Sequence, residues 1–109
     1  MTATVTTADR LRSVRLATLA QDATCTGWHV QVATAQGPPI DVETASLGRR
    51  SGDVLITVTV VVDEPGSPGE HFVGDSHVTS IDGTRDSVRT ALPGLAAIRI
   101  ALAIFEVLT

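Results

Sequence analysis

Residues 53–63 read DVLITVTVVVD, and this stretch decides the fold because it is the clearest strand signal in the chain. Its β-branched side chains are favoured on the packed, pleated surface of a sheet. The next six residues, 64–69, contain two Pro-Gly pairs, which are typical of a tight connection. Residues 70–81 then return as another strand. The sequence therefore predicts a β-hairpin over residues 53–81.

The register of this hairpin follows from the separation of apolar and polar side chains. Pairing Asp63 with His71 collects apolar side chains on one face and polar side chains on the other, whereas a slip of one residue mixes the two sets. The apolar face then holds Ile56, Val58, Val60, Val62, Phe72 and Val78. We expect that face to lie under the helices, and the opposite face to point outward.

Two elements are expected before the hairpin. A helix can begin near Ala8, capped by Thr7, and end near Thr24. Residues 28–35 alternate, with Trp28, Val30 and Val32 on one side, which indicates a half-buried strand. Residues 1–6 are expected to be frayed. Residues 40–52 are expected to form an irregular connection.

The last element is expected to be a helix that starts after Asp82-Gly83-Thr84 and continues to the C-terminus. Pro93-Gly94 should kink or split it. With residues 7–109 as a single domain, the predicted order is α-β-β-β-α. The fold class is α+β, a two-layer sandwich with a three-stranded antiparallel sheet and two helices packed on one face.

The C-terminal stretch is unusual for so small a domain. Residues 95–108 read LAAIRIALAIFEVL, with Arg99 and Glu106 as the charged interruptions. A helix that is apolar on nearly every side needs a second surface to bury against. We expect a homo-oligomer, a dimer as the first choice, with a protein partner or a small effector also possible. The expected interface residues are Leu95, Ile98, Leu102, Phe105 and Leu108.

The polar face of the hairpin is the best candidate for a site. Asp75 and His77 are two residues apart on one strand, and Thr57 and Thr59 lie across from them. A neighbouring carboxylate can orient an imidazole and raise its basicity. However, no serine stands in a recognisable nucleophile motif, and a solvated sheet face explains the same residues. The sequence therefore leans towards a non-enzymatic module, with a small enzyme or ligand-binding protein at Thr57, Thr59, Asp75 and His77 as the alternative.

Charge and composition argue against other classes. The net charge is −4, and all eight basic residues are arginine, a bias that indicates a GC-rich bacterial genome. Nucleic-acid binding needs clustered cations, so it is not expected. The element order resembles that of double-stranded-RNA-binding domains, which begin their final helix with lysines. Here that place reads Asp82-Gly83-Thr84-Arg85-Asp86.

No membrane span or cofactor is expected either. The C-terminal apolar run of about 14 residues is shorter than the roughly 20 that cross a bilayer. One cysteine, Cys25, fits a reducing cytoplasm. His71 and His77 lie about 20 Å apart along one strand, too far to share a metal ion.

Overall fold

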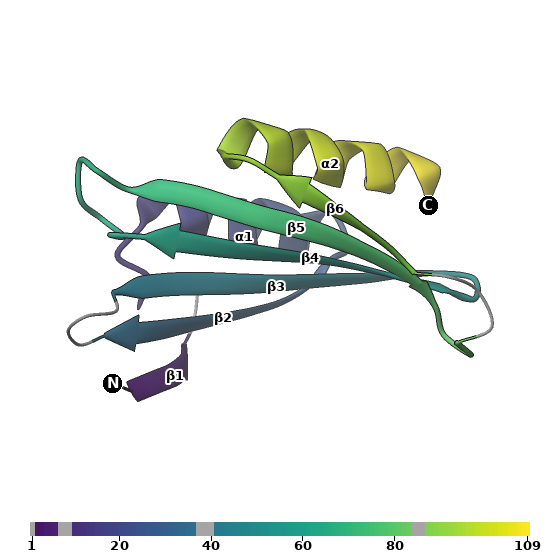
Figure 1. Ribbon diagram of the computed structural model, residues 1–109, viewed down its shortest axis with the longest axis horizontal. Coiled ribbons are helices and arrows are strands. Elements are labelled where there is room, and N and C mark those ends of the chain that lie inside the picture. The colour runs from purple at the N-terminus through teal and green to yellow at the C-terminus, as the bar shows by residue number, and fades with distance from the viewer. Residues whose placement is uncertain (1, 7–9, 37–40, 84–86) are drawn as a thin grey trace.

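The computed structural model describes residues 2–6, 10–36, 41–83 and 87–109, and it is an elongated α+β fold (Figure 1). Six strands and two helices occur in these ranges. In chain order they are β1 (Thr2–Thr6), α1 (Val14–Cys25), β2 (His29–Gln36), β3 (Val42–Ser51), β4 (Val54–Asp63), β5 (His71–Ser80), β6 (Val88–Leu92) and α2 (Leu95–Leu108).

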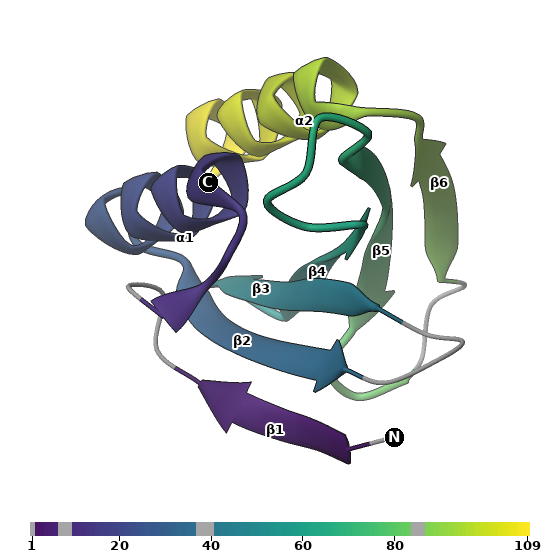
Figure 2. The ribbon, with the colours of Figure 1, turned by 90° about the vertical axis from the view of Figure 1, so that its left-hand side faces the viewer.

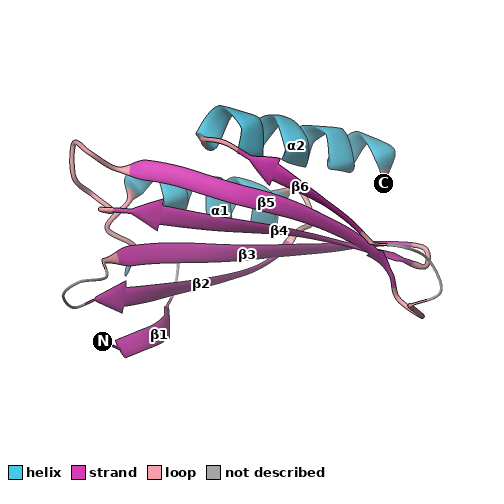
Figure 3. Ribbon diagram, viewed as in Figure 1, coloured by secondary structure: helices cyan, strands magenta, loops and turns pink. Residues whose placement is uncertain are grey.

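The strands form one antiparallel sheet in which each strand pairs with its neighbours in chain order, from β1 to β6. Figure 3 separates this sheet from the two helices by colour. Seen from the end of the sheet, α1 and α2 lie side by side on the same face, and β6 lies at the edge of the sheet on the α2 side (Figure 2). The opposite face is not covered by either helix. Because the sheet is antiparallel, one uncovered face is compatible with a stable fold.

The hydrophobic core lies between the helices and the covered face of the sheet. Val58, Val60 and Val62 of β4 are completely buried there, with Leu16 of α1 and Ile98 of α2. The central strand β4 is buried on this face because it lies between β3, which contacts α1, and β5, which contacts α2. The strand β4, which lies within residues 53–63, thus forms the centre of the fold.

The predicted hairpin register is confirmed. Asp63 pairs with His71, Val62 with Phe72 and Ile56 with Val78. Thr57 pairs with His77 and Thr59 with Asp75 on the uncovered face. The separation of apolar from polar side chains was therefore sufficient to fix the pairing.

The predicted three-stranded sheet is wrong, because the described residues form six strands. Residues 40–52 were expected to be irregular, yet Val42–Ser51 form β3 between β2 and β4. The inward side of β3 carries Glu43 and Arg49 beside Ala45 and Leu47, so it lacks the simple apolar alternation of a strand. Residues 88–92 were expected to be helical and instead form β6, which pairs with β5.

The two ends of the chain also differ in detail from the expectation. Thr2–Thr6, expected to be frayed, pair with β2 as the edge strand β1. Helix α1 begins after Ser13, whose hydroxyl accepts a hydrogen bond from the Leu16 amide at 3.1 Å. The expected cap at Thr7 and start at Ala8 lie outside the described residues. Helix α2 begins directly after Pro93-Gly94, so this pair precedes the helix rather than kinking it.

Gly74 sets the distance between α2 and the sheet. A Cβ atom at this position would lie 2.9 Å from the Thr59 carbonyl oxygen and 3.1 Å from the Ile98 side chain. The absence of a side chain lets Ile98 pack against the backbone of β5. Within the described residues, the helices are too short or too polar to cross a membrane.

Candidate functional site

The four residues of the predicted polar site share the uncovered face of the sheet. Asp75 lies opposite Thr59, and His77 lies opposite Thr57, on the adjacent strands β5 and β4. The structure therefore brings them together as the pairing predicts. Whether this surface binds a ligand stays a prediction, because surface polarity alone is also typical of a solvated sheet.

Asp75 has a partner that the sequence reading did not assign to it. Arg89 of β6 donates from Nη1 to the Asp75 carboxylate at 2.9 Å, and Arg89 pairs with His77 in the strand register. Arg89 had been expected on a helix, so this contact could not be foreseen. An ion pair with Arg89 occupies the carboxylate that was considered as an orienting group for His77.

No metal centre is found among the residues that the structure describes, because no three acidic, histidine or cysteine side chains come close enough together. His29 and His77 do lie in one row across the sheet, but β3 and β4 separate them. Three strand spacings of about 4.8 Å place them roughly 14 Å apart.

Polar contacts hold one side of α2 against α1 and against Trp28, which lies between α1 and β2. Arg99 donates to Asp22 of α1 at 3.2 Å. The Glu106 carboxylate accepts a hydrogen bond from the Trp28 indole at 2.8 Å, and the Trp28 and Phe105 rings meet edge to face at 6.4 Å. Both charged residues of α2 thus make contacts within the chain.

The outer side of α2 has an exposed apolar stripe, which we define as Ile100, Ile104, Val107 and Leu108. Their exposed fractions are 61%, 52%, 86% and 72%. The spacing of four, seven and eight residues from Ile100 keeps them on one side of the helix. In the described part of the chain, nine large apolar side chains are exposed, and four of them belong to this stripe. Such clustering is typical of a surface that contacts another molecule.

The predicted interface residues fall mostly on the opposite side of α2. Ile98 and Leu102 are buried against the sheet, and Leu95 and Phe105 pack at the edge of the core. Leu108 is the one predicted interface residue in the exposed stripe. Arg99 and Glu106 are seven residues apart and so mark one side of the helix. They contact Asp22 of α1 and Trp28, which are distant in the sequence, and for this reason the sequence did not reveal the exposed side.

A groove of about 360 Å³ runs between α2 and the strands β5 and β6. Ala97, Ala101 and Phe105 line it from the helix, and Ile100 and Ile104 of the stripe also border it. Ser76, Thr90 and Leu92 line it from the strands. The lining has no charged side chain. Since β6 was not foreseen, this groove could not be predicted from the sequence.

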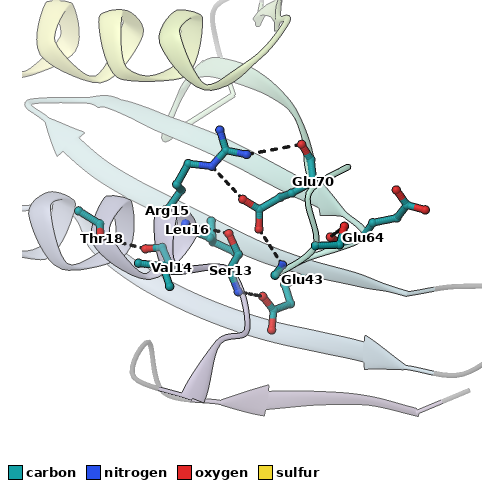
Figure 4. Close-up of polar contacts among 10 residues, drawn as sticks. Ser13, Val14, Arg15, Leu16, Thr18, Glu43, Glu64 and Glu70 are labelled. Carbon is teal, nitrogen blue, oxygen red and sulfur yellow. Dashed lines mark hydrogen bonds and ion pairs between the residues drawn. The ribbon is translucent and has the colours of Figure 1, made fainter.

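The start of α1 is held by two carboxylates from distant strands and loops (Figure 4). Glu43 is completely buried, and its carboxylate accepts hydrogen bonds from the Arg12 and Ser13 amides at 2.8 and 2.9 Å. Glu70 accepts from Arg15 Nε and from the Gly66 amide, both at 2.9 Å. A carboxylate at a helix N-terminus satisfies free amides and complements the helix dipole. These contacts stabilise the fold and leave Glu43 inaccessible to a ligand.

The contacts of Glu70 predict a loss of stability in acid. Burial alone would raise the pKa of Glu70, but the Gly66 amide, the Ser13 hydroxyl and Arg15 together lower it below its ordinary value. The folded state therefore favours the ionised form, so its stabilisation is present at neutral pH and disappears as the pH falls through the lowered pKa.

We expect Glu70→Gln to lose about 1 kcal/mol of unfolding free energy at pH 7. The difference from the wild type should close as the pH falls towards 3. Urea unfolding followed by circular dichroism at several pH values measures both quantities. A constant difference across this pH range would contradict the assignment.

The chain was compared with protein-family models, curated proteins and solved structures, and none of the three comparisons gave a match. The function must therefore be inferred from the stripe and the groove themselves.

Proposed function

We propose that this protein is a small, non-enzymatic cytosolic module that forms a homodimer through the exposed stripe of α2 and binds a protein partner or small effector. The observation that carries the proposal is the stripe itself, four exposed apolar residues in helical phase on the side of α2 that faces away from α1. The single cysteine, Cys25, supports the cytosolic part of the proposal, because free thiols are typical of a reducing compartment.

A second copy of the chain is the simplest partner for the stripe. A twofold axis brings the same patch of both subunits together, so each apolar residue of the stripe becomes buried in both subunits. Fully burying one exposed Leu, Ile or Val contributes about 1.5–3 kcal/mol. Association itself costs about 4–15 kcal/mol. For a stripe of four residues, we expect a dimer of micromolar rather than nanomolar affinity.

The charges of α2 favour this arrangement. Arg99 and Glu106 are held by Asp22 and Trp28 on the side that faces α1. Two copies can therefore bring their stripes together without burying a charge from α2, which would be costly if it were unpaired. The two α2 helices would pack against each other across the twofold axis.

The double substitution Val107→Glu, Leu108→Glu tests whether the stripe forms the dimer interface. It places two charges in the stripe, and we expect the dissociation constant of the dimer to rise by at least about 100-fold because each charge must be desolvated on association. Sedimentation velocity over a concentration series measures the change.

The matched control is Val14→Glu, because Val14 is 75% exposed on α1 and lies outside the stripe. We expect this variant to associate like the wild type. Equal sedimentation of the double variant and the wild type would contradict the proposed interface. Equal loss of association in both variants would show a nonspecific effect of added charge.

A further inference from the structure

Strand β6 forms an open edge of the sheet (Figure 2). It pairs with β5 on one side, and within the described ranges no strand pairs with its other side. An edge strand presents a row of free amide and carbonyl groups, which can pair with a strand of another chain. The five residues of β6 include no proline, and their register against β5 is continuous. No bulge therefore turns this edge away from a partner.

The edge strand and the exposed stripe of α2 belong to one continuous surface. Thr90 and Leu92 of β6 border the same groove as Ile100 and Ile104 of the stripe. Val88, which is 59% exposed, adds an apolar side chain on the covered side of β6. A molecule that covers the stripe from this side therefore also meets the free edge of the sheet.

The sequence of β6 is complementary to itself around its middle residue, Thr90. Antiparallel pairing about a twofold axis through Thr90 sets Val88 opposite Leu92 of the second copy, on the covered side. On the uncovered side, Arg89 lies opposite Ala91 of the second copy. Apolar pairs and threonine pairs stabilise adjacent strands, whereas like charges directly opposite each other destabilise them. The one charged residue of β6 thus does not face its own copy.

The size of the stripe also favours a second contact. A standard interface buries about 800 Å² on each partner and includes about 20–30 residues a side. The stripe has four residues, and β6 adds five residues that adjoin it. An unrelated strand could pair with the edge, but a second copy supplies both a matching strand and a matching stripe. The second copy is therefore the occupant that satisfies the whole surface.

We propose that β6 pairs antiparallel with β6 of a second copy, across the same twofold axis that brings the two stripes together. The sheets of the two subunits then join into one continuous sheet, with the two α2 helices antiparallel above the junction. On the uncovered face, Asp75 and His77 of both copies become parts of one polar surface, because only the two β6 strands separate them. This inference rests on the proposed dimer and adds a second contact to it.

Thr90→Cys in a Cys25→Ser background tests the pairing, because residue 90 lies beside its own copy on the twofold axis. Opposite Cα atoms of antiparallel strands are about 4.5–5.5 Å apart, within the range that a disulfide spans. We expect oxidised glutathione to convert most of this variant to a covalent dimer, measured by nonreducing electrophoresis. Val14→Cys in the same background is the matched control, since Val14 is exposed on α1. We expect it to remain mainly uncross-linked.

Hydrogen exchange of the wild type gives a readout that needs no substitution. Alternate amides of β6 should exchange at least about threefold more slowly as the protein concentration rises through the association range. The amides of β1, the opposite edge of the sheet, should not change and serve as the internal control. Two-dimensional ¹H–¹⁵N NMR of the full chain measures both edges in one sample.

The outcomes separate the strand pairing from the dimer itself. A dimer by sedimentation equilibrium, with neither the Thr90→Cys cross-link nor slower exchange of β6, would overturn the strand pairing and leave the stripe interface in place. A mass that stays at that of a single chain would overturn both. Slower exchange at β1 as well as β6, with a mass beyond that of a dimer, would show open head-to-tail assembly and would overturn the twofold pairing.

Discussion

Replacing Glu43 by alanine is expected to lower the free energy of unfolding by about 3–5 kcal/mol, the range for breaking a buried charged contact. Glu43 is completely buried, and its carboxylate accepts hydrogen bonds from the amides of Arg12 and Ser13, the two residues that precede α1. Its removal leaves these amides without a partner in the core, and it also leaves Arg12 Nε without the carboxylate that lies 3.6 Å away. Urea unfolding at pH 7 measures the change.

Asp41 supplies a matched control for this prediction. It forms an ion pair with the same residue, Arg12, at 2.7 Å, but its side chain is half exposed. Exposed ion pairs contribute about 0–1 kcal/mol, so Asp41→Ala should cost far less than Glu43→Ala. Equal losses in the two variants would show that the ion pair with Arg12, rather than the capping of α1, is what matters.

Ile98→Ala is expected to lower the unfolding free energy by about 2–5 kcal/mol, the usual range for truncation of a buried aliphatic side chain. Ile98 is completely buried, and it packs where Gly74 allows α2 to approach β5. The loss of this contact should loosen α2 from the sheet. Urea unfolding at a protein concentration below the association range isolates the effect from dimer formation.

Leu108→Ala should show the opposite behaviour, because Leu108 lies on the exposed stripe of the same helix. We expect little change in the unfolding of the monomer and a clear weakening of association by sedimentation. Together the two variants test which side of α2 belongs to the core. A large loss of monomer stability in Leu108→Ala, with none in Ile98→Ala, would reverse the assignment.

The sequence predicted those parts of the fold in which the side chains follow a simple pattern. Residues 53–81 alternate strongly, so both the hairpin and its register could be predicted. β3 was missed because its inward positions include Glu43, which is buried only because the distant start of α1 supplies amides to it. No local pattern contains that information. β6 is short and precedes Pro93-Gly94, so it was mistaken for the beginning of the last helix.

The same limits apply to the candidate sites. The surplus of apolar surface on residues 95–108 was evident from composition, but the side of the helix that remains exposed was not. That side depends on contacts of Arg99 and Glu106 with residues about 80 positions earlier in the chain. The groove needs β6 as one wall, and it disappears if residues 88–92 are assumed to be helical. Long-range contacts therefore decide both features.

The central claim is that the exposed stripe of α2 is covered by a second copy of the chain. Sedimentation equilibrium of the wild type over a concentration series, up to about 100 µM, tests it most directly, since this range brackets micromolar affinity. We predict that the mass rises from the chain mass of 11.3 kDa towards twice that value. A mass that stays at 11.3 kDa throughout would contradict the account, because the stripe would then remain exposed to water.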